Sequence, residues 1–168
     1  MSRILYVFRD MPKTTPASNG MHDELSRKKD TMSRMTVEEL LQTPYWIIDI
    51  LPGQVPADSP GQYFTIEGYW MSEPHRTAVK QKQIDLILKL NCYRSLSLDE
   101  GKTQNPSPDS IAEAIQKERA VILLDDAMII SEPDDHYMTL YNPDEKLLTL
   151  IRTLAAGEGL YVWRAENQ

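Results

Sequence analysis

Alternating apolar and polar positions predict β-strands in several separate parts of the chain. The clearest case is residues 62–71, where side chains alternate between an apolar side and a mixed side with a period of two. The apolar side holds Phe64, Ile66, Gly68 and Trp70, and the mixed side holds Tyr63, Thr65, Glu67 and Tyr69. Further strands are expected at 45–51, at 92–98, in a meander within 120–141, and at 160–163.

Helices are predicted where apolar residues recur at steps of three and four, or where capping residues stand before such a pattern. Residues 76–91 have this spacing, and Thr36 with Glu39 has the spacing of a capping box. Ser107 followed by Pro108 predicts a helix to about residue 117. Asn142 as cap and Pro143 in the first turn predict a last helix that Gly157 ends.

These elements predict one compact α+β domain over residues 35–168, with a mostly antiparallel sheet and three to four helices. A mixed α/β sheet is the alternative. Residues 1–34 are polar and lack apolar periodicity, so we expect a flexible N-terminal arm or linker. Residues 3–8 have strand composition and could dock on the body as one further strand.

Charge is distributed unevenly along the 168 residues, whose formal net charge is −7. Residues 1–34 hold seven Lys or Arg and four Asp or Glu, whereas residues 35–168 hold eleven and twenty-one, a net charge of −10. Direct nucleic-acid binding is not expected, because it depends on clustered basic residues. An acidic body instead favours association with a basic protein partner.

Several classes of protein are disfavoured by what the sequence lacks. Cys92 is the single cysteine, and no apolar run is long enough for a membrane helix or a signal peptide, so we expect a cytoplasmic protein without membrane contact. The chain has no Gly-rich phosphate loop, dinucleotide fingerprint, G-x-S-x-G elbow or H-E-x-x-H motif. Common nucleotide-binding and hydrolase machinery is therefore not predicted.

An acidic cluster is the strongest candidate for chemistry. Oxygens from both ends of this cluster could converge on Mg²⁺ or Ca²⁺ and support a metal-dependent hydrolase. Its members are Asp125, Asp126, Glu132, Asp134, Asp135 and His136. We favour the alternative that these residues form solvated turns without a cofactor, because Asp commonly caps turn amides.

A second candidate is nucleophilic catalysis by Cys92 with His75 or His136 as its base. A single cysteine at the start of a strand is more often a small buried hydrophobic residue, and we favour that interpretation.

The aromatic residues around the loop of Pro52, Pro56 and Pro60 are a third candidate. Prolines restrict the loop and could present Asp58 and Gln62 in a fixed shape to a partner, or merely connect two sheet edges. We expect Trp46, Phe64 and Trp70 in the core, which leaves Tyr63, Glu67 and Tyr69 as candidate binding residues. Asp49 interrupts an apolar strand and needs a partner or a sheet edge.

Three functional hypotheses follow from these patterns. The first, which we favour, is a small acidic cytoplasmic interaction or regulatory protein without catalytic activity, of the inhibitor or immunity type. The second is the metal-dependent hydrolase. The third is a ligand sensor with a pocket between the sheet and the helix of residues 76–91.

Overall fold

The computed structural model describes residues 35–165 of the 168. The expected N-terminal arm, with its possible strand at residues 3–8, lies outside the described residues. No helix within 35–165 combines the length and the hydrophobicity that crossing a bilayer requires.

Seven strands form one antiparallel sheet in the order β3-β2-β4-β5-β6-β1-β7. Every pair of neighbouring strands runs antiparallel, which confirms the predicted antiparallel α+β fold over the mixed alternative. The strands are β1 (Tyr45–Asp49), β2 (Ser97–Leu98), β3 (Thr103–Gln104), β4 (Ala120–Leu124), β5 (Ala127–Ser131), β6 (Met138–Tyr141) and β7 (Tyr161–Arg164).

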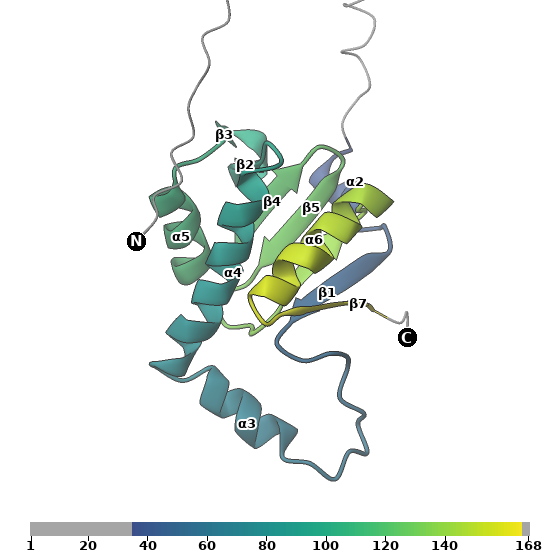
Figure 1. Cartoon of the computed structure of the whole chain (residues 1–168), viewed down its shortest axis with the longest axis vertical. Coiled ribbons are helices and arrows are strands. Elements are labelled where there is room, and N and C mark those ends of the chain that lie inside the picture. Colours follow the sequence, from purple (N-terminus) through teal and green to yellow (C-terminus); the bar gives the residue numbers. More distant parts are fainter. Residues whose placement is uncertain (1–34, 166–168) are drawn as a thin grey trace, which may run out of the picture. The chain divides into compact units, whose positions relative to one another are not determined.

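Five α-helices and one short 3₁₀ turn, Asp99–Gly101, complete the described part of the chain. The three longest helices cover one face of the sheet (Figure 1), whereas α3 lies beyond the first turn of α4, outside that layer. The helices are α2 (Val37–Leu40), α3 (Tyr63–Trp70), α4 (His75–Asn91), α5 (Pro108–Lys117) and α6 (Glu145–Gly157).

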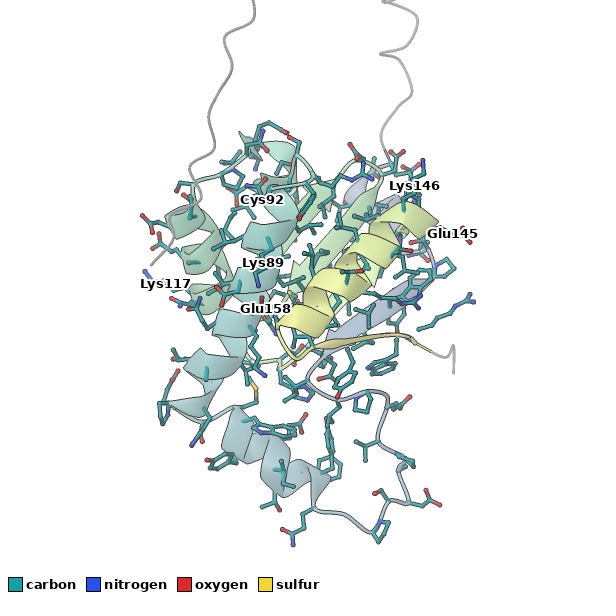
Figure 2. The ribbon with its side chains drawn as sticks, viewed as in Figure 1. Lys89, Cys92, Lys117, Glu145, Lys146 and Glu158 are labelled. Carbon is teal, nitrogen blue, oxygen red and sulfur yellow. The ribbon has the colours of Figure 1, made fainter. Side chains whose placement is uncertain are left out.

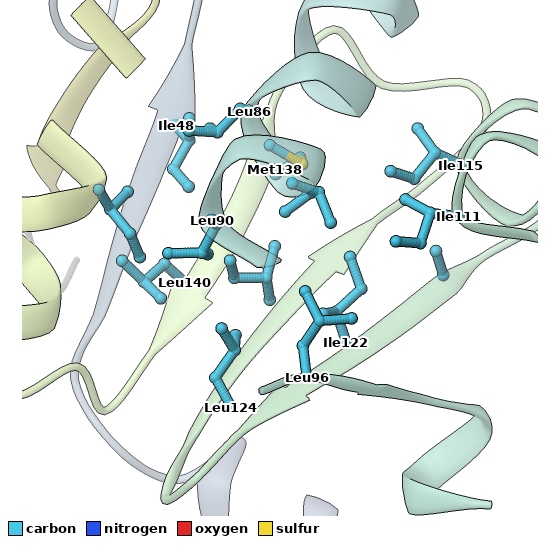
Figure 3. Close-up of a cluster of buried hydrophobic side chains, with 14 of the residues drawn as sticks. Ile48, Leu86, Leu90, Leu96, Ile111, Ile115, Ile122, Leu124, Met138 and Leu140 are labelled. Atoms are coloured by element: carbon cyan, nitrogen blue, oxygen red, sulfur yellow. The ribbon is translucent and has the colours of Figure 1, made fainter. Parts of the chain in front are cut away.

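The main core fills the space between the sheet and these three helices (Figure 3). Leu86 and Leu90 of α4 meet Leu140 of β6 and Ile122 of β4, and all four side chains are buried. This packing corrects the expectation of a ligand pocket between the sheet and the helix of residues 76–91, because apolar side chains close that space.

The residues that the structure describes cover only part of the opposite face of the sheet. Leu40 of α2 packs against Met128 and Ile130 of β5, forming a second, smaller cluster. The predicted capping box places this helix: the Thr36 amide donates to Glu39 Oε2 at 2.8 Å, and the Glu39 amide donates to Thr36 Oγ1 at 3.2 Å. The cavity described below lies on the outer face of β1, β6 and β7.

The predicted strand at residues 62–71 is wrong, because Tyr63–Trp70 form helix α3. Alternation predicts a strand only where one side is buried, but α3 has no buried residue, and Phe64 is 83% exposed. The core assignment of Phe64 is therefore also wrong. Trp46 is half-buried and packs against the main core, as expected, and Trp70 is half-buried.

Two further element boundaries differ from the sequence expectations. Only Ser97–Leu98 of the predicted strand 92–98 pairs, because α4 continues to Asn91. The last helix begins at Glu145, since the Asp144 side chain accepts from the Leu147 amide at 2.7 Å. Asn142 instead has φ of 49° and donates through Nδ2 to the Asp126 carbonyl, which suits a turn.

The two adjacent leucines of α2 allow a matched test of this packing. Leu40→Ala should lower the free energy of unfolding by about 2–4 kcal/mol, because Leu40 is 1% exposed against β5. Leu41→Ala should cost less than about 1 kcal/mol, because Leu41 is 39% exposed. Urea unfolding of both variants measures the difference, and equal losses would contradict this seating of α2.

Candidate functional site

The centre of the candidate site is a buried pair formed by Asp49 and His136. Asp49 ends strand β1, and His136 lies in the loop between β5 and β6. His136 Nδ1 lies 2.9 Å from Asp49 Oδ1, and the two residues are 2% and 4% exposed. Asp49 thus finds the partner that a carboxylate within an apolar strand requires.

Helix α3 approaches the other side of the same imidazole ring. His136 Nε2 lies 3.2 Å from the Tyr63 hydroxyl and 3.3 Å from Glu67 Oε1, and the Tyr63 hydroxyl donates to Glu67 Oε1 at 2.7 Å. Tyr63 and Glu67 are four residues apart, so a helix places both on the same side. This geometry ties α3 to the loop between β5 and β6.

Side chains of helix α4 hydrogen-bond to the loop between β5 and β6. The buried Lys80 ammonium group donates to the carbonyls of Glu132 and Asp135, and it also contacts Gln83 Oε1 at 3.1 Å. Gln83 in turn donates to the carbonyl of His136 at 3.2 Å. The backbone that carries His136 is therefore fixed by two polar side chains on the buried side of α4.

The electrostatics of the site favour a protonated His136. Burial lowers its pKa, but the hydrogen bond to Asp49 and the charges of Asp49 and Glu67 outweigh burial, so the pKa is raised. Burial and then Glu67 raise the pKa of Tyr63, which stays a neutral hydroxyl. Burial lowers the pKa of Lys80 to about 8, against the nearby Asp135, which favours its charged form.

A protonated His136 satisfies both sides of its ring. Its Nδ1–H donates to Asp49, and its Nε2–H points to the oxygens of Tyr63 and Glu67. A general base needs a free nitrogen near its substrate, whereas this imidazolium is held between two carboxylates. The arrangement is that of a buried ionic anchor.

A cavity of about 760 Å³ opens beside this anchor, on the face of the sheet opposite the long helices. Its floor comes from the outward residues of β1, β6 and β7, and its rim from the loop after β1. Its side chains include Tyr45, Asp49, Tyr63, Tyr137, Tyr141 and Trp163.

The structure brings together three of the residues singled out in the sequence: Tyr63, Glu67 and His136. Tyr69 lies elsewhere and stacks on His75, with ring centroids 3.7 Å apart. Asp58 and Gln62 are exposed on the loop that leads into α3.

The structure does not bring the acidic cluster together. Asp125 and Asp126 lie in the turn before β5, whereas Asp134 and Asp135 lie in the turn after it. The five residues of β5 separate these turns by about 16 Å. Within residues 35–165, no group of three or more His, Cys, Asp or Glu side chains is placed to hold a metal ion.

Cys92 is exposed rather than buried, so the favoured core interpretation is wrong. It lies at the end of α4 that is remote from α3 (Figure 2). Twelve residues of helix separate it from Lys80, which holds the His136 loop, a distance of about 18 Å along the axis. Cys92 and His136 therefore do not form a nucleophile and base pair.

Sequence reasoning missed Lys80 and Gln83. Both belong to α4 and are buried, three residues apart, alongside Ile84 and Ile87. The signal was present, because a helix places Lys80, Gln83 and Ile87 on one side. Polar residues on an apolar side indicate buried polar partners elsewhere in the fold.

The raised pKa of His136 predicts a specific pH dependence of stability. A base whose pKa is higher in the folded state contributes stability that is present below its unfolded pKa of about 6.5 and lost as pH rises through the folded pKa. The unfolding free energy of wild type minus that of His136→Gln should therefore fall as pH rises above about 6.5.

Urea unfolding at successive pH values gives this difference, and a flat or rising difference would contradict the anchor. Subtracting the unfolding free energy of His136→Gln from that of wild type also cancels the contribution of Lys80, which has the opposite dependence on pH. Its pKa is lowered to about 8, so its burial penalty declines as pH rises from there towards the ordinary 10.5.

Loss of the α3 contact should loosen α3 alone. Glu67→Gln weakens the contact with His136, and α3 has no buried residue to compensate. Amide hydrogen exchange within residues 66–70 should rise about three- to tenfold, while exchange in β5 and β6 stays unchanged. Glu145→Gln, at the exposed start of α6, is the control. Unchanged exchange in α3 would show that other contacts hold it.

Comparison with known proteins gives no guide to this site. The chain matches no protein-family model, no curated protein and no solved structure. Its function therefore has to be argued from the geometry of the described residues.

Proposed function

We propose that this protein is a small acidic binding protein without catalytic activity, which engages a basic protein partner through α3 and the loop before it. The observation that carries the proposal is that α3 is fixed by the polar contacts of Tyr63 and Glu67 and exposes the apolar side chains of Phe64, Ile66 and Tyr69 around the rest of its surface.

Helix α3 presents an unusually apolar surface for so short an element. Phe64, Ile66 and Tyr69 are all exposed, and α3 has no buried residue. Exposed apolar side chains that cluster on one element are typical of protein interaction sites. Aromatic residues in particular supply much of the binding energy at such sites.

The surroundings of α3 match a basic partner. Residues 51–75 carry three carboxylates and no Lys or Arg. Glu67 contacts His136 and Glu73 pairs with Arg76, so Asp58 is the excess negative charge of this stretch. This local excess agrees with the net charge of −10 over residues 35–168. Complementary charge speeds the encounter with a basic protein and orients it, while the apolar residues supply affinity.

The buried anchor supports a binding role over a catalytic one. Both nitrogens of His136 face carboxylate or hydroxyl oxygens, and the result is a fixed position for α3. Pre-positioning a recognition element lowers the ordering cost of association. A site built in this way suits an inhibitor or immunity-like protein that must hold its surface in one shape.

A first step identifies the partner by site-specific cross-linking in the native host. Benzoylphenylalanine in place of Phe64 should capture a basic protein, whereas the same group in place of Tyr93 should not. Tyr93 is a matched control, because it is also an exposed aromatic residue, at 66%, and follows the distant end of α4.

Phe64→Ala should then weaken binding of the purified partner at least about tenfold, because a central aromatic residue commonly contributes that much. Its free energy of unfolding should change by less than about 0.5 kcal/mol, since the side chain is 83% exposed. Tyr93→Ala should leave the affinity within about twofold. Titration calorimetry measures the affinity of each variant for the partner, and equal affinities of Phe64→Ala and Tyr93→Ala would refute the proposed surface.

Charge is tested separately on the loop. Asp58→Lys should lower the affinity for the partner and reduce the salt dependence of the association rate. An effect that is independent of salt would show that the partner is not recognised through its basic charge.

A further inference from the structure

The cavity on the outer face of β1, β6 and β7 is not explained by a protein partner on α3. Its volume of about 760 Å³ falls in the range typical of small-molecule sites and exceeds what one inserted side chain would fill. The strand positions that face it carry half-buried aromatic rings. Such rings on an otherwise open sheet face indicate a surface that is covered by a ligand.

From the chemistry of this lining we infer that the cavity binds a small organic cation, with an ammonium or guanidinium group placed beside the Asp49 carboxylate and the rings of Tyr63 and Tyr137, which flank His136. The inference goes beyond the proposed function, because a ligand here needs neither a protein partner nor the exposed side of α3.

The charges of the lining exclude an anion as the natural ligand. None of the described residues that line the cavity is Lys or Arg. His136 is the single basic side chain in the lining, and both of its ring nitrogens already face oxygens of Asp49, Tyr63 and Glu67. A phosphate or carboxylate ligand would meet the Asp49 carboxylate in the lining, and the one cation beside it, His136, is already shared with Glu67.

Asp49 supplies the attraction for a cation. It is 4% exposed and lies in the cavity lining, where low solvent access strengthens a charge interaction. His136 contacts Oδ1, and an ionised carboxylate accepts further hydrogen bonds through its second oxygen. With His136 protonated, Asp49 and Glu67 still leave one net negative charge in the site.

The aromatic rings complete a site for an organic cation. The rings of Tyr63 and Tyr137 lie 6.4 and 5.4 Å from the ring of His136, which contacts Asp49. Tyr45 and Tyr141 line the far end of the cavity, four residues or about 13 Å along β1 from Asp49. Cations are attracted to the faces of such rings, and the attraction grows as water is removed. The Trp163 indole N–H donates to the Leu51 carbonyl at 3.2 Å, which joins β7 to the rim loop.

The test compares two cations with an uncharged analogue on the full chain. Choline and agmatine are titrated by calorimetry beside 3,3-dimethylbutan-1-ol, which has the shape of choline without its charge. Choline should bind at least about tenfold more tightly than the alcohol, because charge and cation–π attraction both contribute. Acetate should not bind.

A matched pair of variants locates the binding. Thr139→Lys puts an ammonium group into the cavity, since Thr139 lines it, and should abolish choline binding. Thr149→Lys makes the same change of charge on the exposed side of α6 and should leave the affinity within about twofold. Thermal melting confirms that both variants fold. If Thr139→Lys does not fold, shifts of the Tyr63 and Tyr137 ring signals in wild type locate the site instead.

Several results would overturn the inference. These are equal affinities for choline and its uncharged analogue, tighter binding of acetate, absence of saturable binding by either cation, or unchanged affinity in a folded Thr139→Lys variant. A cationic side chain of a partner would give another pattern, in which a basic protein binds while choline and agmatine neither bind nor compete. That result would also overturn a small-molecule site.

Discussion

The position of helix α3 depends on one buried imidazolium. His136 lies between Asp49 on β1 and Glu67 on α3, and it is 2% exposed. Removing a charge from water costs several kcal/mol, which only close and well-oriented partners offset. A helix with no buried residue has little hydrophobic reason to stay on the body, so its placement rests on this polar contact and on the half-buried Trp70, whose ring centroid lies 6.0 Å from that of His136.

Helix α4 makes that contact possible, because it serves both the core and the site. Leu86 and Leu90 pack against the sheet, while Lys80 and Gln83 hold the loop that carries His136. The apolar packing fixes the helix, and the fixed helix fixes the loop. The geometry of the site is thus inherited from the core through a rigid element, which is how a precise polar arrangement survives without much surface of its own.

Sequence reasoning recovered the parts of the fold that local rules determine. The capping box at Thr36, the helix from Pro108 and the meander of β4, β5 and β6 follow from hydrogen-bonding capacity and periodicity, and the structure has all three. Periodicity does not predict the structure of residues 63–70. Alternation there suggests a strand with one buried side, but the segment is a helix without a buried residue. Burial depends on tertiary contacts, and this segment makes few of them.

The same distinction explains what could be predicted of the site. Asp49 was recognised as needing a partner, since a carboxylate in an apolar strand has to be satisfied. Which residue satisfies it depends on the pairing of β1 with β6, across 87 residues of sequence, and local rules do not reach that far. The acidic pairs show the converse. They are close in sequence, yet they lie at opposite ends of β5.

The two faces of the sheet have different roles because only one of them is sealed. Three helices close the first face with apolar side chains, which supplies stability and leaves no room for a ligand there. Within residues 35–165, Leu40 covers the second face over β5, with Met35 and Val37 beside it, and the remainder of that face carries tyrosines and a tryptophan around a cavity. His136 stands where this open face meets α3, since Tyr63 both lines the cavity and contacts the ring. Occupancy of the cavity and the position of α3 are therefore linked through a shared side chain, so a ligand that moves Tyr63 would also alter the surface proposed for the partner.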